Sequence, residues 1–163
     1  YLIIGVPSTK NIEFLDKIPE SKDNYKIYFI TRKEMNYNFT NNKIEIIKNI
    51  STENYMKLLE EIHYIITLFK ENSNYHNNRV SGVIPFSYMF RIPLITDIEY
   101  KKKSNDFIFD DLTYQNNENN FIEIFNKSLL IDNLDYYDMT LKINNYLEEQ
   151  IKSQEEIFNK IFS

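Results

Sequence analysis

The first 30 residues, YLIIGVPSTKNIEFLDKIPESKDNYKIYFI, set the pattern that decides the fold. Two short apolar runs, at residues 1–5 and 25–30, are typical of buried strands and are too far apart for a hairpin. Residues 6–9 have the chemistry of a turn, and Ser8 or Thr9 is expected to cap a helix over residues 11–18. A strand, a helix and a second strand in this order predict a right-handed βαβ unit and a parallel sheet.

The same alternation continues to about residue 110. Further strands are predicted at residues 43–47, 64–69, 93–96 and 107–109, with helices after Ser51 and ending near Phe90. Beyond Asp110, residues 121–130 and 134–162 are predicted to be helical. We therefore expect residues 1–163 to form a single Rossmann-like domain, a three-layer α/β/α fold with about six parallel strands and long C-terminal helices.

Composition restricts the possible functions. A hydrophobic content of 42% indicates a globular core, while a net charge of −5 lacks the basic footprint of a nucleic-acid-binding protein. The absence of cysteine excludes disulfides and thiolate metal sites, and the two histidines are far apart, so we expect no metal site and no tightly bound cofactor. No apolar run approaches the ~18–20 residues of a membrane span and no signal peptide is visible, so a cytoplasmic location is expected.

Two further features concern the origin of the sequence. Residues with AT-rich codons are abundant, so we attribute asparagine pairs such as Asn116-Asn117 to genome bias and give them little functional weight. The chain also begins without methionine, directly inside a strand pattern, which predicts that an N-terminal part of a larger protein is missing.

Two loops are candidates for ligand binding, because ligands of parallel α/β sheets lie beyond the carboxyl ends of the strands. The first loop, residues 5–10, contains Gly5 and Lys10 but no G-x-G-x-x-G fingerprint. Lys10 is a candidate for phosphate binding, although an exposed lysine at a helix start has the same sequence signature.

The second loop is YHNNRVSGVIP, residues 75–85, between a predicted strand and an apolar helix. Ser81 is the expected N-cap, and Gly82 would let a bulky anion approach the backbone. Arg79 adds a planar cation suited to a diphosphate, and His76 is a candidate contact to phosphate or sugar. A capped helix with a surface arginine and an exposed histidine is the alternative interpretation.

The stretch RVSGVIPFSYMFRIPLI, residues 79–95, resembles the donor-site segment of GT-B glycosyltransferases. In that family a glycine-containing helix start is followed by a helix and then by G-x-P-V-I on the next strand. RIPLI at residues 91–95 matches the last piece, with Arg91 in place of the usual glycine. Asn78 and Phe86 stand where many retaining members have two glutamates, and Val6 stands where an arginine is usual.

The resemblance implies the C-terminal half of a glycosyltransferase that transfers a sugar from a nucleotide-diphosphate sugar. This domain would bind the nucleotide and diphosphate, and the missing N-terminal domain would supply the acceptor and the catalytic base, so the isolated domain is expected to be inactive. The binding residues would be Gly5, Lys10, His76, Arg79, Ser81 and Gly82; no catalytic residue is assigned. Two alternatives are a non-catalytic Rossmann-like interaction module, favoured by the lost glutamates, and a nucleotide-sugar epimerase of the same architecture.

Overall fold

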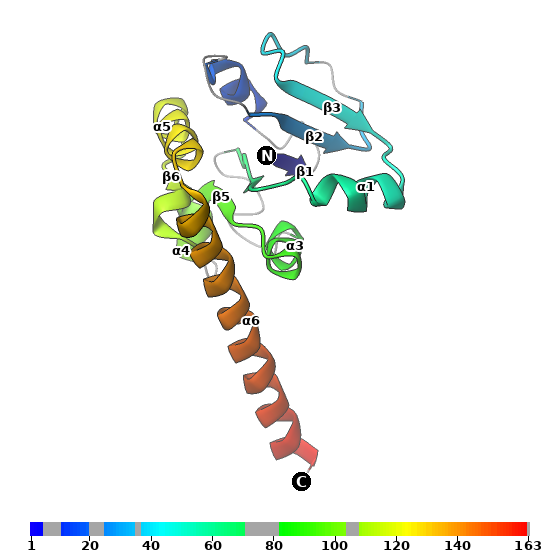
Figure 1. Ribbon diagram of the computed structural model, residues 1–163, viewed down its shortest axis with the longest axis vertical. Helices are drawn as coiled ribbons and strands as arrows, with labels where there is room; N and C mark the ends of the chain where they lie inside the picture. Colours follow the sequence, from blue (N-terminus) through cyan, green and yellow to red (C-terminus); the bar gives the residue numbers. More distant parts are fainter. Residues whose placement is uncertain (5–10, 20–24, 35–36, 71–81, 104–107, 163) are drawn as a thin grey trace.

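The protein forms one six-stranded parallel sheet in the order β3-β2-β1-β4-β5-β6 (Figure 1). The computed structural model describes residues 1–4, 11–19, 25–34, 37–70, 82–103 and 108–162. The strands are β1 (Leu2–Ile4), β2 (Ile27–Thr31), β3 (Ile44–Lys48), β4 (Ile65–Ile66), β5 (Leu94–Asp97) and β6 (Thr113–Tyr114). The parallel sheet expected from the sequence is thus confirmed.

Helices lie between consecutive strands along the chain except between β2 and β3, where the described residues contain none. They are η2 (Ile12–Lys17) and η3 (Asp110–Leu112), both 3-10, and the α-helices α1 (Thr52–Leu59), α3 (Val83–Phe90), α4 (Ile98–Lys103), α5 (Glu118–Leu129) and α6 (Asn133–Phe162). The predicted start of α1 is confirmed, because the Ser51 hydroxyl accepts a hydrogen bond from the Asn54 amide at 3.2 Å. The predicted helix after β1 is a 3-10 helix with Asn11 as its N-cap; Ser8 and Thr9 lie outside the described residues.

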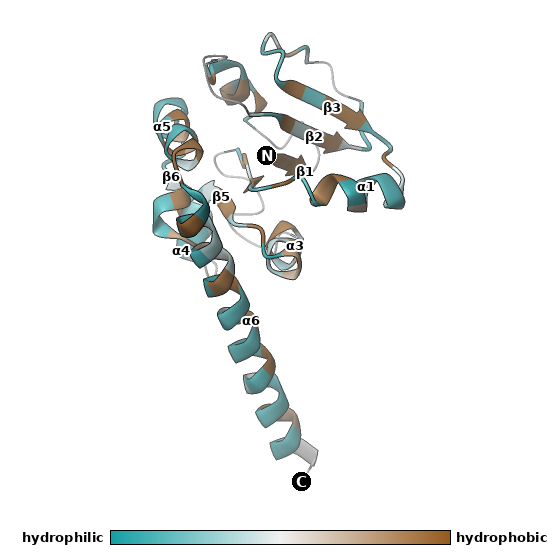
Figure 2. Cartoon of the chain, viewed as in Figure 1, coloured by the Kyte–Doolittle hydropathy of each residue, from teal (hydrophilic) through white to brown (hydrophobic). Residues whose placement is uncertain are grey.

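Alternate residues of each strand enter two separate hydrophobic cores. Leu2, Ile65 and Leu94 pack on one face of the sheet with α1 and α3. Ile3, Ile66 and Ile95 pack on the other face with η2 and α5. Because both faces of a parallel sheet must be covered, its central strands are largely apolar, and Figure 2 shows β1 and much of β2 in the hydrophobic colour. The fold is the expected three-layer α/β/α Rossmann-like arrangement.

The sixth strand lies elsewhere than predicted. Ile108 and Phe109, at the end of the predicted strand 107–109, precede η3, and β6 is Thr113–Tyr114. Ile108 is buried in the core without being part of a strand. An apolar run of three residues has no periodicity that separates a strand from a buried connection, which explains the error.

Helix α6 is one unbroken helix of 30 residues. Its first half packs on the domain through Tyr136, Ile143 and Tyr146. From residue 148 to residue 160 every side chain is exposed, and Figure 1 shows this part projecting beyond the sheet and its helices. Most of it is polar, and Figure 2 shows separate hydrophobic stretches along it. Ile151 and Phe158 are among its exposed apolar side chains. Despite its length α6 is too polar for a bilayer span, and no other helix in the described ranges qualifies.

A matched pair of phenylalanines tests this division between core and overhang. Phe125 is fully buried, with ring centroids of Tyr1 and Tyr25 at 4.5 and 5.3 Å, whereas Phe158 is 61% exposed. We expect Phe125→Ala to lower the free energy of unfolding by about 3–5 kcal/mol, because it leaves a cavity among packed rings. Phe158→Ala should change it by less than about 0.5 kcal/mol, both measured by denaturant titration. A large loss at Phe158 would mean that the end of α6 is packed in solution.

Candidate functional site

The candidate site lies at the carboxyl edge of the sheet. The chain adds β2 and β3 on one side of β1 and then crosses to add β4, β5 and β6 on the other side. The switch point is therefore between β1 and β4, and ligands of doubly wound sheets bind in the crevice beyond this point. Residues 5–10 directly follow β1. Residues 71–81 follow residues 65–70, which begin with β4 and are called the β4 segment below. The two loops chosen from the sequence therefore both come after strands at the switch point.

Most of the predicted binding residues are in these two loops. Five of the six lie outside the described residues: Gly5, Lys10, His76, Arg79 and Ser81. The sixth, Gly82, is exposed and is the N-cap of α3, a position that the sequence analysis had assigned to Ser81. The misassignment arises because α3 begins one residue later than expected, at Val83. A Cβ built on Gly82 would meet no described heavy atom within 4 Å, so no described neighbour requires a glycine here.

Basic residues gather at the carboxyl ends of three strands. Arg32 and Lys33 follow β2, Lys48 is the last residue of β3, and Lys70 follows the β4 segment. In this stretch of the described edge the one exposed carboxylate is Glu34, and it pairs with Lys48 at 2.9 Å. The edge is therefore locally positive in a chain whose net charge is −5. Such an arrangement attracts anionic ligands.

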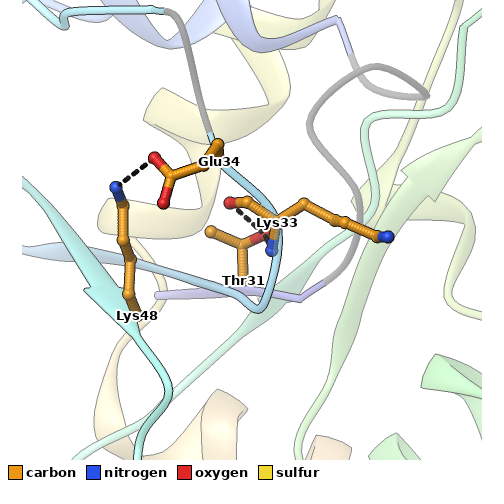
Figure 3. A network of polar contacts seen from close by, with 4 residues as sticks. All are labelled: Thr31, Lys33, Glu34 and Lys48. Atoms are coloured by element: carbon orange, nitrogen blue, oxygen red, sulfur yellow. Dashed lines mark hydrogen bonds and ion pairs between the residues drawn. The ribbon is translucent and has the colours of Figure 1, made fainter.

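The turn after β2 is held from its buried side. Thr31 is 3% exposed. Its hydroxyl accepts a hydrogen bond from the Lys33 amide at 3.0 Å and donates to the Lys33 carbonyl at 3.3 Å (Figure 3).

Exposed ion pairs contribute at most about 1 kcal/mol, so the Lys48–Glu34 pair orients the Glu34 side chain more than it stabilises the fold. Neither Arg32 nor Lys33 pairs with a carboxylate of the described residues.

Two asparagines tie the end of the β4 segment to its neighbours. The Asn11 side-chain amide donates to the Phe69 carbonyl at 3.2 Å and to the Asn116 side-chain oxygen at 2.8 Å. Asn116 also donates to the Phe69 carbonyl, at 3.3 Å, and the Asn11 backbone amide donates to the Leu68 carbonyl at 2.8 Å. This cluster joins the chain at η2, β4 and the turn before α5. Sequence analysis missed it because asparagine pairs were attributed to genome bias.

A second polar cluster fixes β4, β5 and β6 relative to one another. Thr67, Thr96, Asp97 and Tyr114 are all fully buried. Thr67 donates to the Thr96 hydroxyl at 2.6 Å, and the Tyr114 hydroxyl donates to the Thr67 carbonyl at 2.6 Å. Burial, together with the nearby Asp97 charge, raises the pKa of Tyr114 well above its ordinary value, so it stays a neutral donor. Asp97 accepts the Tyr100 amide at 2.9 Å at the start of α4.

A shallow groove on the α1 face is a weaker candidate. It has a volume of about 400 Å³ and lies between α1 and the strands β2 and β3. Both of its lysines are already paired: Lys26 pairs with Glu45 at 2.5 Å, which raises the pKa of Lys26, and Lys57 pairs with Glu53 at 2.7 Å. A charged ligand would have to break these pairs, which makes this groove less suitable for an anion than the carboxyl edge.

The described residues supply electrostatic binding groups and neutral hydrogen-bond donors. Within the described ranges no three acidic or histidine side chains are placed to share a metal ion. Asp110 pairs with Lys101, and Asp111 pairs with Lys127 at 2.8 Å, which lowers the pKa of Asp111. These two carboxylates precede β6 and so lie away from its carboxyl end. What the carboxyl edge can do chemically is hold an anionic ligand.

Comparison with known proteins adds no relative. No protein-family model matches the chain, and no curated protein matches it. The functional interpretation therefore depends on the fold and on the residues at the carboxyl edge.

The buried hydroxyl of Tyr114 can be tested directly. We expect Tyr114→Phe to lower the free energy of unfolding by about 1–3 kcal/mol, because the Thr67 carbonyl loses a buried donor. Tyr137, which is 61% exposed, provides a matched control, and Tyr137→Phe should cost less than about 0.5 kcal/mol. Equal stability of the two variants in denaturant titrations would show that the Tyr114 hydroxyl does not hold the sheet edge.

Proposed function

We propose that this chain is the nucleotide-binding domain of a glycosyltransferase and holds the nucleotide and diphosphate of a nucleotide-sugar donor. The observation that carries the proposal is the locally positive carboxyl edge at the switch point of a 3-2-1-4-5-6 sheet, formed by Arg32, Lys33, Lys48 and Lys70. Sheets of this order bind nucleotides at this point, with phosphates close to helix N-termini.

The geometry of residue 91 supports the resemblance to GT-B enzymes. Arg91 ends α3 in the left-handed conformation, with φ 56° and ψ 33°. Left-handed positions favour glycine, which is the residue expected here from the family pattern, and an ordinary side chain costs roughly 1–2 kcal/mol. In Arg91 this conformational cost is offset by a hydrogen bond from its Nε to the Asn144 side-chain oxygen on α6, at 2.8 Å.

The same residues suggest how the domain would assist the reaction. Departure of a nucleoside diphosphate builds negative charge on the phosphate oxygens. Lys70, Arg79 and Lys10 would offset that charge together with backbone amides at the start of α3, which is electrostatic stabilisation of the transition state. The acceptor and the base would come from a second domain, as the resemblance to GT-B enzymes implies.

The exposed half of α6 favours the alternative of an interaction module. Ile151, Ile157 and Phe158 are more than half exposed on a helix segment about 20 Å long. Isolated helices of this length are only marginally stable in water, so a partner surface would stabilise it. A folded domain that binds no nucleotide would support this function.

Isothermal titration of the domain with UDP, GDP, CDP and ADP tests the proposal. We expect one of the four to bind selectively. Arg79→Ala should weaken binding by about tenfold or more, as expected for a charge-assisted contact. Lys70→Ala should weaken it by about two- to fivefold, because exposed charges contribute less.

Lys57→Ala is the matched control, since Lys57 is an exposed lysine that pairs with Glu53 on α1. It should leave the affinity unchanged. The proposal is wrong if none of the four nucleotides binds while circular dichroism shows a folded domain.

A further inference from the structure

The turn after β2 has two positive charges, Arg32 and Lys33, at a position that does not contact the diphosphate in dinucleotide-binding sheets. In dinucleotide-binding sheets, an acidic residue about 20 positions after the first turn binds the ribose hydroxyls, and a nearby arginine accommodates a phosphate on the ribose. Here Arg32 is the first residue after β2 and Lys33 is the second. The position that meets the ribose in those sheets is thus basic in this chain.

The register of the sheet brings this turn to the switch point. β1 pairs directly with β2, with Ile4 opposite Ile30, so Arg32 lies two residues beyond the position that faces Ile4. Neighbouring strands lie about 4.8 Å apart. A ligand whose phosphates lie beyond β1 would therefore pass within side-chain reach of Arg32 and Lys33.

The local structure keeps the two cations available. Thr31 fixes the turn through the backbone of Lys33, which leaves the lysine side chain out of the hydrogen bonding. Glu34 is held by Lys48, and Figure 3 shows the Lys33 side chain extending away from this pair. Three cations and one carboxylate at this turn (3 − 1) leave a local charge of +2 in the described residues.

We infer that Arg32 and Lys33 bind an acidic substituent on a sugar ring of the ligand. The substituent is a carboxylate on the transferred sugar or a phosphate on the ribose, since the planar guanidinium matches both groups with two parallel hydrogen bonds. The inference rests on the proposed function, because it places the ligand at the switch point.

Matched ligand pairs test the inference by isothermal titration, with the base that binds best among the four nucleoside diphosphates. For uridine, the first pair is UDP-glucose and UDP-glucuronate, and the second is UDP and its 3′-phosphate. We expect the acidic member of one pair to bind about tenfold more tightly, the effect of one charge-assisted contact. The pair that shows the preference identifies the substituent.

Variants connect the preference to the turn. In the double variant Arg32→Ala/Lys33→Ala the preference should fall to less than about twofold, because the acidic member loses much more affinity than the neutral member. Both side chains are exposed, and alanine at position 33 keeps the backbone hydrogen bonds to Thr31, so the fold should be retained. Lys57→Ala controls for a general loss of positive charge.

Three outcomes would overturn the inference. If the neutral member of each pair binds as tightly as the acidic one, the turn does not bind an acidic group. The proposed function still stands in that case. If the preference survives in the double variant, other residues are responsible. If no nucleoside diphosphate binds at all, the proposed function and this inference fail together.

Discussion

The burial of both faces of a short parallel sheet is the constraint on which the rest of the structure depends. β1 and β4 lie at its centre, and alternate residues of these strands, such as Leu2 and Ile3, enter opposite cores. Burying one such side chain contributes about 1.5–3 kcal/mol, so the short central strands stabilise the fold by burying side chains on both faces. Polar groups are excluded from the middle of the sheet and collect where the strands end.

That exclusion accounts for the two polar clusters at the carboxyl edge. The β4 segment ends between β1 and β5, and its backbone carbonyls at Thr67 and Phe69 both accept hydrogen bonds from side chains. Tyr114 serves the first carbonyl, and Asn11 and Asn116 serve the second. Because buried polar groups must be paired, these contacts fix the edge of the sheet from which both candidate ligand loops leave.

The distribution of charge separates the two sides of the molecule. On the α1 face, lysines and glutamates pair with one another at the groove. At the carboxyl ends of β2 and β4, Arg32, Lys33 and Lys70 have no such partner among the described residues. In a chain with more acids than bases this unpaired positive charge is concentrated where a doubly wound sheet binds its ligand. It links the fold to the proposed function and to the inference about an acidic sugar.

The sequence by itself determined the fold class, most of the strands and the start of α1, because periodic apolar runs and the Ser51 cap are local signals. It also selected the loops after β1 and the β4 segment, since strand alternation predicts which ends meet. Only the tertiary structure decided the place of β6, the Asn11–Asn116 contact across 105 residues and the Lys48–Glu34 pair between β3 and the turn after β2. These depend on which distant segments pack together, and a short apolar run or a common asparagine has the same local signal in either arrangement.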